Sequence, residues 1–320
     1  MSDPSGSPHD GEWRHHLVHA ELSDLIIDYD AETGQRRPVR VDDVVALLEG
    51  AGHWRSVRLA RRLPTRGEFF DEDGVDGILL RSHLELQRLA EEIRLGQHVA
   101  RLLLALRNTL DVERFVVVDV GCGLGYVIRH LAESGALGPE AELIGVDYNR
   151  SLLGAAQRLA ELESLPCRFI RGNAFDLDLD ATVFISSGVI HHFAATELAD
   201  FFARQRAVGA QAVMHFDVAP SRLSPIGAWL FHWARMREPL ARHDGVRSAL
   251  RAHLDDTLVG AIRDGVPEWT PMLFDATTDR PPWLNVMRPI IGMDPAKVER
   301  FRDQLGPLGD RLRVVTRSPS

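Results

Sequence analysis

The spacing of hydrophobic positions divides the chain into three parts. Over residues 13–110, apolar side chains recur every three or four residues, which is typical of amphipathic helices. Over residues 115–218, short apolar runs alternate with amphipathic segments. Over residues 221–282 this alternation stops, and helix-like segments carry large aromatic side chains. We therefore predict an N-terminal helical cap over 13–110, followed by an α/β domain over 111–320 with a helical insertion over 221–282.

The alternation also predicts the fold class. Strands that alternate with helices at this spacing form a mostly parallel sheet with helices on both faces. We expect a doubly wound, Rossmann-like α/β sheet that binds its ligand at the carboxyl ends of the strands. A long helix that includes Leu86 and Leu106 is expected in the cap, weakened near Gly96. The predicted strands are 116–120, 143–146, 167–171, 182–186, 212–218, 284–293 and 312–316, and the other predicted helices are 126–133, 151–162, 197–208 and 295–305.

Composition narrows the classes of partner. The chain has 320 residues, 45% hydrophobic and 26% charged, which is ordinary for a globular protein with a large core. Its formal net charge of -9 repels phosphate backbones, so we expect no nucleic-acid partner. The two cysteines, Cys122 and Cys167, are too few for a disulfide framework.

Residues 1–12 are polar and expected to be disordered. Since we find no secretory signal and no apolar run of about 20 residues, we expect a cytoplasmic protein without a membrane partner.

A glycine-rich segment follows the first predicted strand. Gly121, Gly123 and Gly125 stand where a loop leaves the carboxyl end of that strand. Glycines let the backbone approach a ligand closely, and the next helix offers unpaired N–H groups. A dinucleotide-binding fingerprint needs glycine at position 126, where this chain has Tyr126. The segment favours a ligand other than a dinucleotide, and a plain tight turn is the alternative.

Polar residues follow the second and third predicted strands. Asp147 ends the second strand, where an acidic side chain can accept both hydroxyls of a ribose. An exposed strand-end aspartate without a ligand is the alternative. Asn173 and Ala174, before Phe175, follow the third strand and suit the edge and face of an adenine, or simply form a turn.

A histidine pair follows the fourth predicted strand. Ser187 and Gly188 are small enough to let backbone carbonyls reach a bound ammonium, and His191 and His192 come next. Histidine titrates near neutral pH, so either can act as a general base, and we favour His191. Neighbouring loop residues are expected to point in different directions. A purely structural pair is the alternative, and we expect no metal, because no Cys, His or Glu ligands with zinc-site spacing accompany the pair.

In combination these segments resemble a known family. Residues 116–126, Val-Val-Val-Asp-Val-Gly-Cys-Gly-Leu-Gly-Tyr, resemble the first motif of class I S-adenosylmethionine-dependent methyltransferases. Val146-Asp147 resembles their second-strand acidic motif, and residues 189–193 are similar to small-molecule members of the family. The resemblance covers about residues 110–220 and departs from the family at Asn173, where many members carry an acidic residue.

The resemblance implies S-adenosylmethionine as cofactor and a set of residues that bind it. Asp119 and the glycines would surround the methionine part, Asp147 would bind the ribose, and residues 172–175 would contact the adenine. The cofactor-binding set implied in this way is Asp119, Gly121, Cys122, Gly123, Gly125, Asp147, Tyr148, Asn173, Ala174, Ser187 and Gly188.

The resemblance implies methyl transfer from this cofactor but does not identify the acceptor. The apolar and aromatic segment after the fifth strand favours a small, largely apolar acceptor, and a histidine base favours an oxygen or nitrogen as the methylated atom. We expect a place in secondary metabolism. Trp229 and Trp233, in the aromatic segment after the fifth strand, are candidates for contact with this acceptor or for plain core. Three alternatives stay open: an NAD(P)-dependent oxidoreductase, another enzyme that uses the same cofactor without methyl transfer, and a non-enzymatic protein of the same fold.

Overall fold

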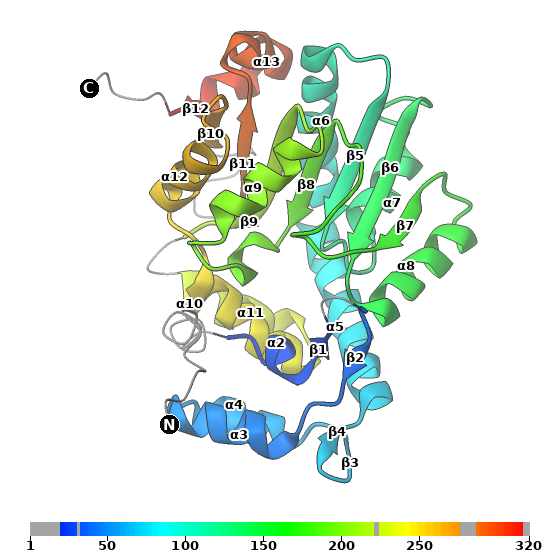
Figure 1. Cartoon of the computed structure of the whole chain (residues 1–320), viewed down its shortest axis with the longest axis vertical. Helices are drawn as coiled ribbons and strands as arrows, with labels where there is room; N and C mark the ends of the chain where they lie inside the picture. The colour runs from blue at the N-terminus through cyan, green and yellow to red at the C-terminus, as the bar shows by residue number, and fades with distance from the viewer. Residues whose placement is uncertain (1–19, 31–32, 221–223, 276–285, 316–320) are drawn as a thin grey trace, which may run out of the picture. The chain divides into compact units, whose positions relative to one another are not determined.

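The computed structural model describes residues 20–30, 33–220, 224–275 and 286–315 (Figure 1). Within it the chain forms two compact units: residues 1–82 with 225–251, and residues 83–224 with 252–320. The predicted tail over residues 1–12 lies outside the described residues. In the described part of the chain, none of the helices combines the length and apolarity that a bilayer crossing requires.

The first unit is mainly helical. Asp244 links its two chain segments, since its carboxylate accepts hydrogen bonds from the backbone N–H groups of Leu22 (2.9 Å) and Ser23 (3.1 Å). It thereby supplies the N-terminal cap that the helix starting at Leu22 lacks locally. The elements are α2 (Leu22–Ile26), β1 (Asp28–Tyr29), β2 (Arg36–Arg37), α3 (Val41–Gly50), α4 (Trp54–Ala60), β3 (Thr65–Arg66), β4 (Phe69–Phe70), the start of α5 (Glu72–Glu92), α10 (Ser224–Arg235) and α11 (Pro239–Arg251).

The second unit contains the sheet. Its strands are β5 (Phe115–Val120), β6 (Ala141–Asp147), β7 (Arg168–Arg171), β8 (Val183–Ser187), β9 (Ala212–Val218), β10 (Thr270–Phe274), β11 (Met287–Met293) and β12 (Leu312–Val314). Its helices are the end of α5, then α6 (Leu95–Leu110), α7 (Tyr126–Ser134), α8 (Arg150–Leu162), α9 (Leu198–Ala207), α12 (Asp255–Gly265) and α13 (Val298–Leu305), with short 3-10 turns η1 (Ile190–His192), η3 (Pro295–Lys297) and η4 (Gly306–Arg311).

The strand order is β12-β10-β11-β9-β8-β5-β6-β7 (Figure 1). The five strands from β7 to β9 are parallel, which confirms the doubly wound, mostly parallel sheet. At the other end β11 runs antiparallel to both β9 and β10, and β12 runs antiparallel to β10. Strand β10 corrects the sequence prediction, because it lies within residues 221–282, where we predicted a helical insertion. Its apolar run is short and buried, and strands and buried helices of that length have similar hydrophobic patterns.

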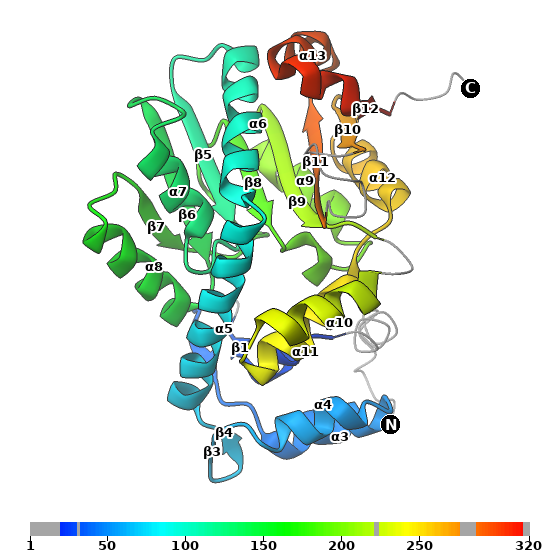
Figure 2. The ribbon, with the colours of Figure 1, turned by 180° about the vertical axis from the view of Figure 1, so that it is seen from behind.

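The sheet has a separate core on each face. Along β5, Phe115 and Val117 contribute to the core that α6, α7 and α13 cover, and α6 is seen along this face in Figure 2. Val116 and Val118 contribute to the core under α9 and α12. The alternation follows from the two-residue period of a strand, and burial on both faces explains why β5 is apolar at every position except Asp119.

The long helix predicted in the cap is two helices. Helix α5 ends at Glu92 and α6 begins at Leu95, with Arg94 in the left-handed region at φ 60°. The break thus comes just before Gly96. A β-carbon at Gly96 would lie 2.4 Å from the His130 ring of α7, so this glycine serves close helix packing.

Candidate active site

Four polar side chains gather at one edge of the sheet because the carboxyl ends of parallel strands meet there. Asp119 lies near the end of β5, Asp147 ends β6, Ser187 ends β8, and Asp217 lies near the end of β9. In doubly wound sheets this is the edge at which ligands bind.

The glycine loop needs its glycines for conformation and for space. Gly121, Gly123 and Gly125 all have left-handed backbones, at φ 68°, 53° and 68°. A β-carbon would lie 2.6 Å from Val189 at Gly121 and 2.3 Å from Phe169 at Gly125. Any other residue would both strain the backbone and collide with these neighbours. The loop is therefore a tight, closely packed turn that leads into α7.

Asp147 binds the glycine loop directly. Its Oδ2 accepts a hydrogen bond from the Gly123 N–H (2.8 Å) and its Oδ1 accepts one from the Asn149 N–H (2.8 Å). The Asp147 side chain is buried, which excludes the alternative of an exposed strand-end aspartate. Burial raises the pKa of Asp147, while these two hydrogen bonds and the nearby His83 charge oppose the shift. The glycine loop and Asp147 are thus joined by a hydrogen bond at the ends of the adjacent strands β5 and β6.

Asp119 lies near Asp147 but has fewer hydrogen-bond partners. It is buried, and its Oδ1 has no hydrogen-bond partner among the described residues. Burial, and then the charge of Asp147, raises the pKa of Asp119 to about 8. A buried carboxylate oxygen without a donor fits a cationic or N–H-bearing ligand group, because such a group would supply the missing hydrogen bond.

The other residues predicted to bind cofactor have varied surroundings. Asn173 is exposed, and its side-chain oxygen accepts a hydrogen bond from the Phe175 N–H (3.0 Å), the turn role that we left open. Ala174 is partly buried and Tyr148 is 49% exposed. Ser187 and Gly188 lie at the end of β8, where Gly188 has φ 70°.

Cys122 lies in the loop with its N–H bonded to the Val146 carbonyl (3.0 Å). Burial raises the pKa of its thiol well above the ordinary value, so the thiol is protonated at neutral pH. Cys122 therefore presents an uncharged thiol in the loop, and both it and Cys167 are free cysteines.

His191 forms a buried pair with Asp217. The Asp217 carboxylate accepts from the His191 backbone N–H (2.9 Å) through Oδ2 and contacts His191 Nδ1 (2.7 Å) through Oδ1. Burial raises the pKa of Asp217, but the charge and hydrogen bonds of His191 outweigh it and leave the pKa below its ordinary value. An ionised Asp217 fixes the proton on Nδ1 and leaves Nε2 as the nitrogen that can accept another.

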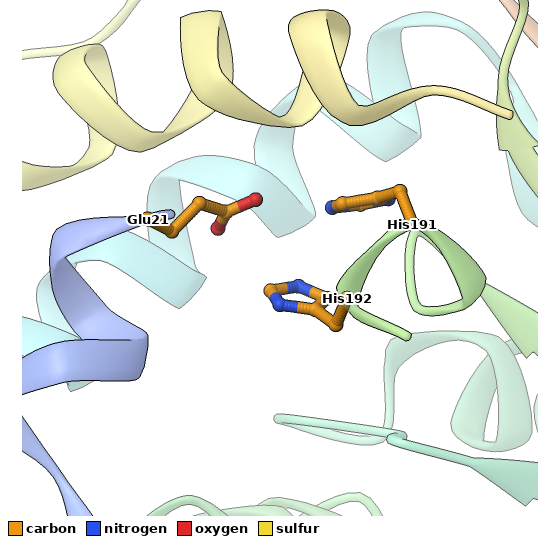
Figure 3. Close-up of side chains that lie close together, drawn as sticks. All are labelled: Glu21, His191 and His192. Carbon is orange, nitrogen blue, oxygen red and sulfur yellow. The ribbon is translucent and has the colours of Figure 1, made fainter. Parts of the chain in front are cut away.

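His192 lies beside His191 rather than turned away from it. The ring centroids are 4.4 Å apart and the planes are tilted by 31° (Figure 3). Our expectation that the neighbouring rings would point in different directions was wrong, because the side chains of His191 and His192 converge at the end of η1 and their rings pack against each other. Asp217, and not His192, orients His191.

Two residues of the site were missed in the sequence. Asp217 had a usable signal, since it is an acid at the carboxyl end of a parallel strand, like Asp119 and Asp147. His83 of α5 had none, because it lies in an ordinary amphipathic helix far from the motifs. A β-carbon on Gly123 would lie 2.8 Å from the His83 ring.

Trp229 and Trp233 belong to α10 of the first unit. Their rings are stacked with centroids 6.5 Å apart, and the side chains are 50% and 61% exposed. They are therefore not core residues of that unit.

Comparison with known proteins identifies the central region. A family model described as a methyltransferase domain matches residues 117–211, which hold the glycine loop, Asp147 and the histidine pair. A putative protein N5-glutamine methyltransferase of Methanocaldococcus jannaschii is 28% identical over 102 residues, which cover 32% of this chain and 45% of that protein. The chain thus spans less than half the length of this relative.

Solved structures are similar over larger shares of the chain. Magnesium protoporphyrin IX methyltransferase from Synechocystis PCC 6803, with bound SAH, matches with TM-score 0.44 and 15% identity over 79% of this chain and 99% of that one. A putative O-methyltransferase from Nostoc punctiforme PCC 73102 matches with TM-score 0.44 and 14% identity over 90% and 99%.

Proposed function

We propose that this protein is an S-adenosylmethionine-dependent methyltransferase, because residues 117–211 match the methyltransferase domain family. The acceptor would be an oxygen or nitrogen of a small, largely apolar molecule, with a place in secondary metabolism. The observation that carries the proposal is that the glycine loop, Asp147 and an Asp119 oxygen with no hydrogen-bond partner in the described part of the chain lie at one edge of the sheet.

The chain's own residues suit the parts of this cofactor. Asp119 would accept from the ammonium of the methionine part, which would supply the donor that its Oδ1 does not find among the residues the structure describes. Asp147 would accept from the ribose hydroxyls with the lone pairs that its two backbone hydrogen bonds leave. The cofactor supplies a methyl group already activated on a sulfonium, so positioning the acceptor contributes much of the acceleration.

His191 would take the proton of the acceptor. Asp217 holds the proton of the imidazole on Nδ1, and Nε2 is then a base for an acceptor O–H or N–H. Deprotonation raises the nucleophilicity of the acceptor atom, which typically contributes roughly 10²–10⁴-fold in rate. The paired carboxylate then stabilises the imidazolium that forms.

Calorimetry with purified protein tests the cofactor. We expect micromolar binding of S-adenosylhomocysteine and no binding of NAD(P)H. Binding of NAD(P)H without binding of S-adenosylhomocysteine would contradict the proposal and support the alternative of an oxidoreductase. Methyl-labelled cofactor, incubated with panels of phenols, carboxylic acids and azoles, then tests transfer, and cofactor binding without transfer to any acceptor would favour a non-methylating protein.

A further inference from the structure

His83 places an imidazole ring against the glycine loop, and neither the sequence motifs nor the sheet explains why it is there. Its ring lies so close to the loop that a β-carbon at Gly123 would be 2.8 Å from His83 Cδ2 and 3.4 Å from Nε2. The Gly123 N–H in turn bonds Asp147 (2.8 Å). Helix α5 therefore brings an imidazole to the loop that precedes α7.

The charges around the loop explain why a cation is needed there. Asp119 and Asp147 are both buried at this edge, and the charge of Asp147 contributes to the raised pKa of Asp119. An ionised Asp147, joined by Asp119 once Asp119 has lost its proton, attracts the ammonium of an amino acid and repels its carboxylate, and at low dielectric this repulsion is large. The charge of His83 acts in the opposite direction, because it lowers the pKa of Asp147.

We propose that His83 binds the α-carboxylate at the amino-acid end of the cofactor. The loop would then recognise both charges of that end, the ammonium through Asp119 and the carboxylate through His83. This inference rests on the proposed function, since it concerns the same cofactor. It adds a ligand contact from outside the methyltransferase domain match over residues 117–211.

Two probes separate the amino-acid end from the rest of the molecule. S-Adenosylhomocysteine carries the ammonium and carboxylate, whereas 5′-methylthioadenosine keeps the adenine, ribose and thioether but lacks both charges. We would measure the dissociation constants of both by calorimetry for wild type and His83→Gln. His130→Gln is the matched control, because the His130 ring packs on Gly96 of α6 and on Tyr126, whereas the side chain that faces Gly123 is His83.

We expect His83→Gln to weaken S-adenosylhomocysteine roughly 10–100-fold and 5′-methylthioadenosine less than about threefold. The control should change neither, and unchanged melting temperatures would show that the variants fold. Equal weakening of both probes would mean that His83 acts through the loop, which overturns the inference. Unchanged binding of both probes would also overturn it and leave the proposed function standing. Failure of wild type to bind either probe would instead sink the proposed function, and the inference with it.

Discussion

The two buried aspartates at the ends of β5 and β6 differ in how their charge is stabilised. Asp147 accepts hydrogen bonds from two backbone N–H groups, whereas one oxygen of Asp119 has no donor among the described residues. An ionised buried carboxylate is stable only where donors or cations surround it. Asp119 therefore keeps its proton to about pH 8, whereas backbone donors stabilise the charge of Asp147.

Cofactor affinity should depend on pH through Asp119. Below its pKa of about 8 the carboxyl is protonated and must lose that proton before it can accept fully from an ammonium. The affinity for S-adenosylhomocysteine should therefore rise as the pH rises from about 6 to about 8, by up to tenfold per pH unit, and then level off. Calorimetry across this range measures it. Asp119→Asn should remove the dependence, and a flat wild-type profile would contradict the assignment.

The same pKa makes a prediction for the ligand-free protein. The folded pKa of Asp119 lies above the ordinary 3.8, so the unfolded chain releases this proton at lower pH. The contribution of Asp119 to the free energy of unfolding should then decrease as the pH rises from about 4 to about 8. Denaturant titrations of wild type and Asp119→Asn isolate this contribution, and a difference between them that does not change with pH would refute it.

Asp147 has both a structural and a binding role, and two substitutions separate them. Asp147→Asn keeps one acceptor oxygen and should weaken S-adenosylhomocysteine roughly 10–150-fold. Asp147→Ala should also destabilise the fold by about 1–3 kcal/mol for each N–H left unpaired, those of Gly123 and Asn149. Asp178→Asn is an exposed control. Full affinity in Asp147→Asn would place Asp147 outside the site.

The His191–Asp217 pair predicts a catalytic pattern. His191→Gln should lower kcat roughly 10²–10⁴-fold and lose the acid limb of the pH–rate profile, with cofactor affinity unchanged. Asp217→Asn should lower kcat in a similar range, because an amide does not select the same tautomer. His192→Gln should change kcat little. If both histidine variants turn over normally, the pair is structural and transfer relies on positioning alone.

At the scale of elements, α10 has an exposed apolar face. Ile226, Trp229, Leu230 and Trp233 are each at least half exposed, and they follow one another at helical spacings. Large apolar patches of this kind mark binding surfaces more often than plain surface. We propose that this face contacts the apolar acceptor, which extends the sequence-based hypothesis for Trp229 and Trp233.

Truncation of this face tests the hypothesis. Trp233→Ala should raise the KM of the acceptor several-fold and leave the affinity for S-adenosylhomocysteine unchanged, because uniform binding energy is lost. Trp54→Ala is the control, because Trp54 is also strongly exposed but lies on α4. A change in cofactor affinity with unchanged KM would contradict an acceptor role for α10.

At the scale of the whole molecule, the net charge of -9 bears on partners. Association with nucleic acid draws most of its non-specific affinity from cations that displace counterions from phosphates. We therefore expect no change in the fluorescence anisotropy of labelled duplex DNA or RNA at micromolar protein. Salt-dependent binding in that range would show a local basic surface that outweighs the overall charge.

The sequence by itself determined the features that depend on neighbours along the chain. Hydrophobic period distinguishes strand from helix locally, so it placed the five parallel strands within a residue or two and fixed the sheet class. The glycine loop and Asp147 were found because parallel strands bring their carboxyl ends together.

Tertiary structure decided what depends on distant partners. His191 pairs with Asp217, which is 26 residues away along the chain. His83 of helix α5 lies against Gly123 of the glycine loop, which is also distant in the sequence. The raised pKa of Asp119 arises from burial, and the assignment of β10 to the sheet arises from its pairing with β11. Burial and long-range pairing are properties of the packed chain, because a residue's dielectric surroundings and partners exist only once distant segments have come together.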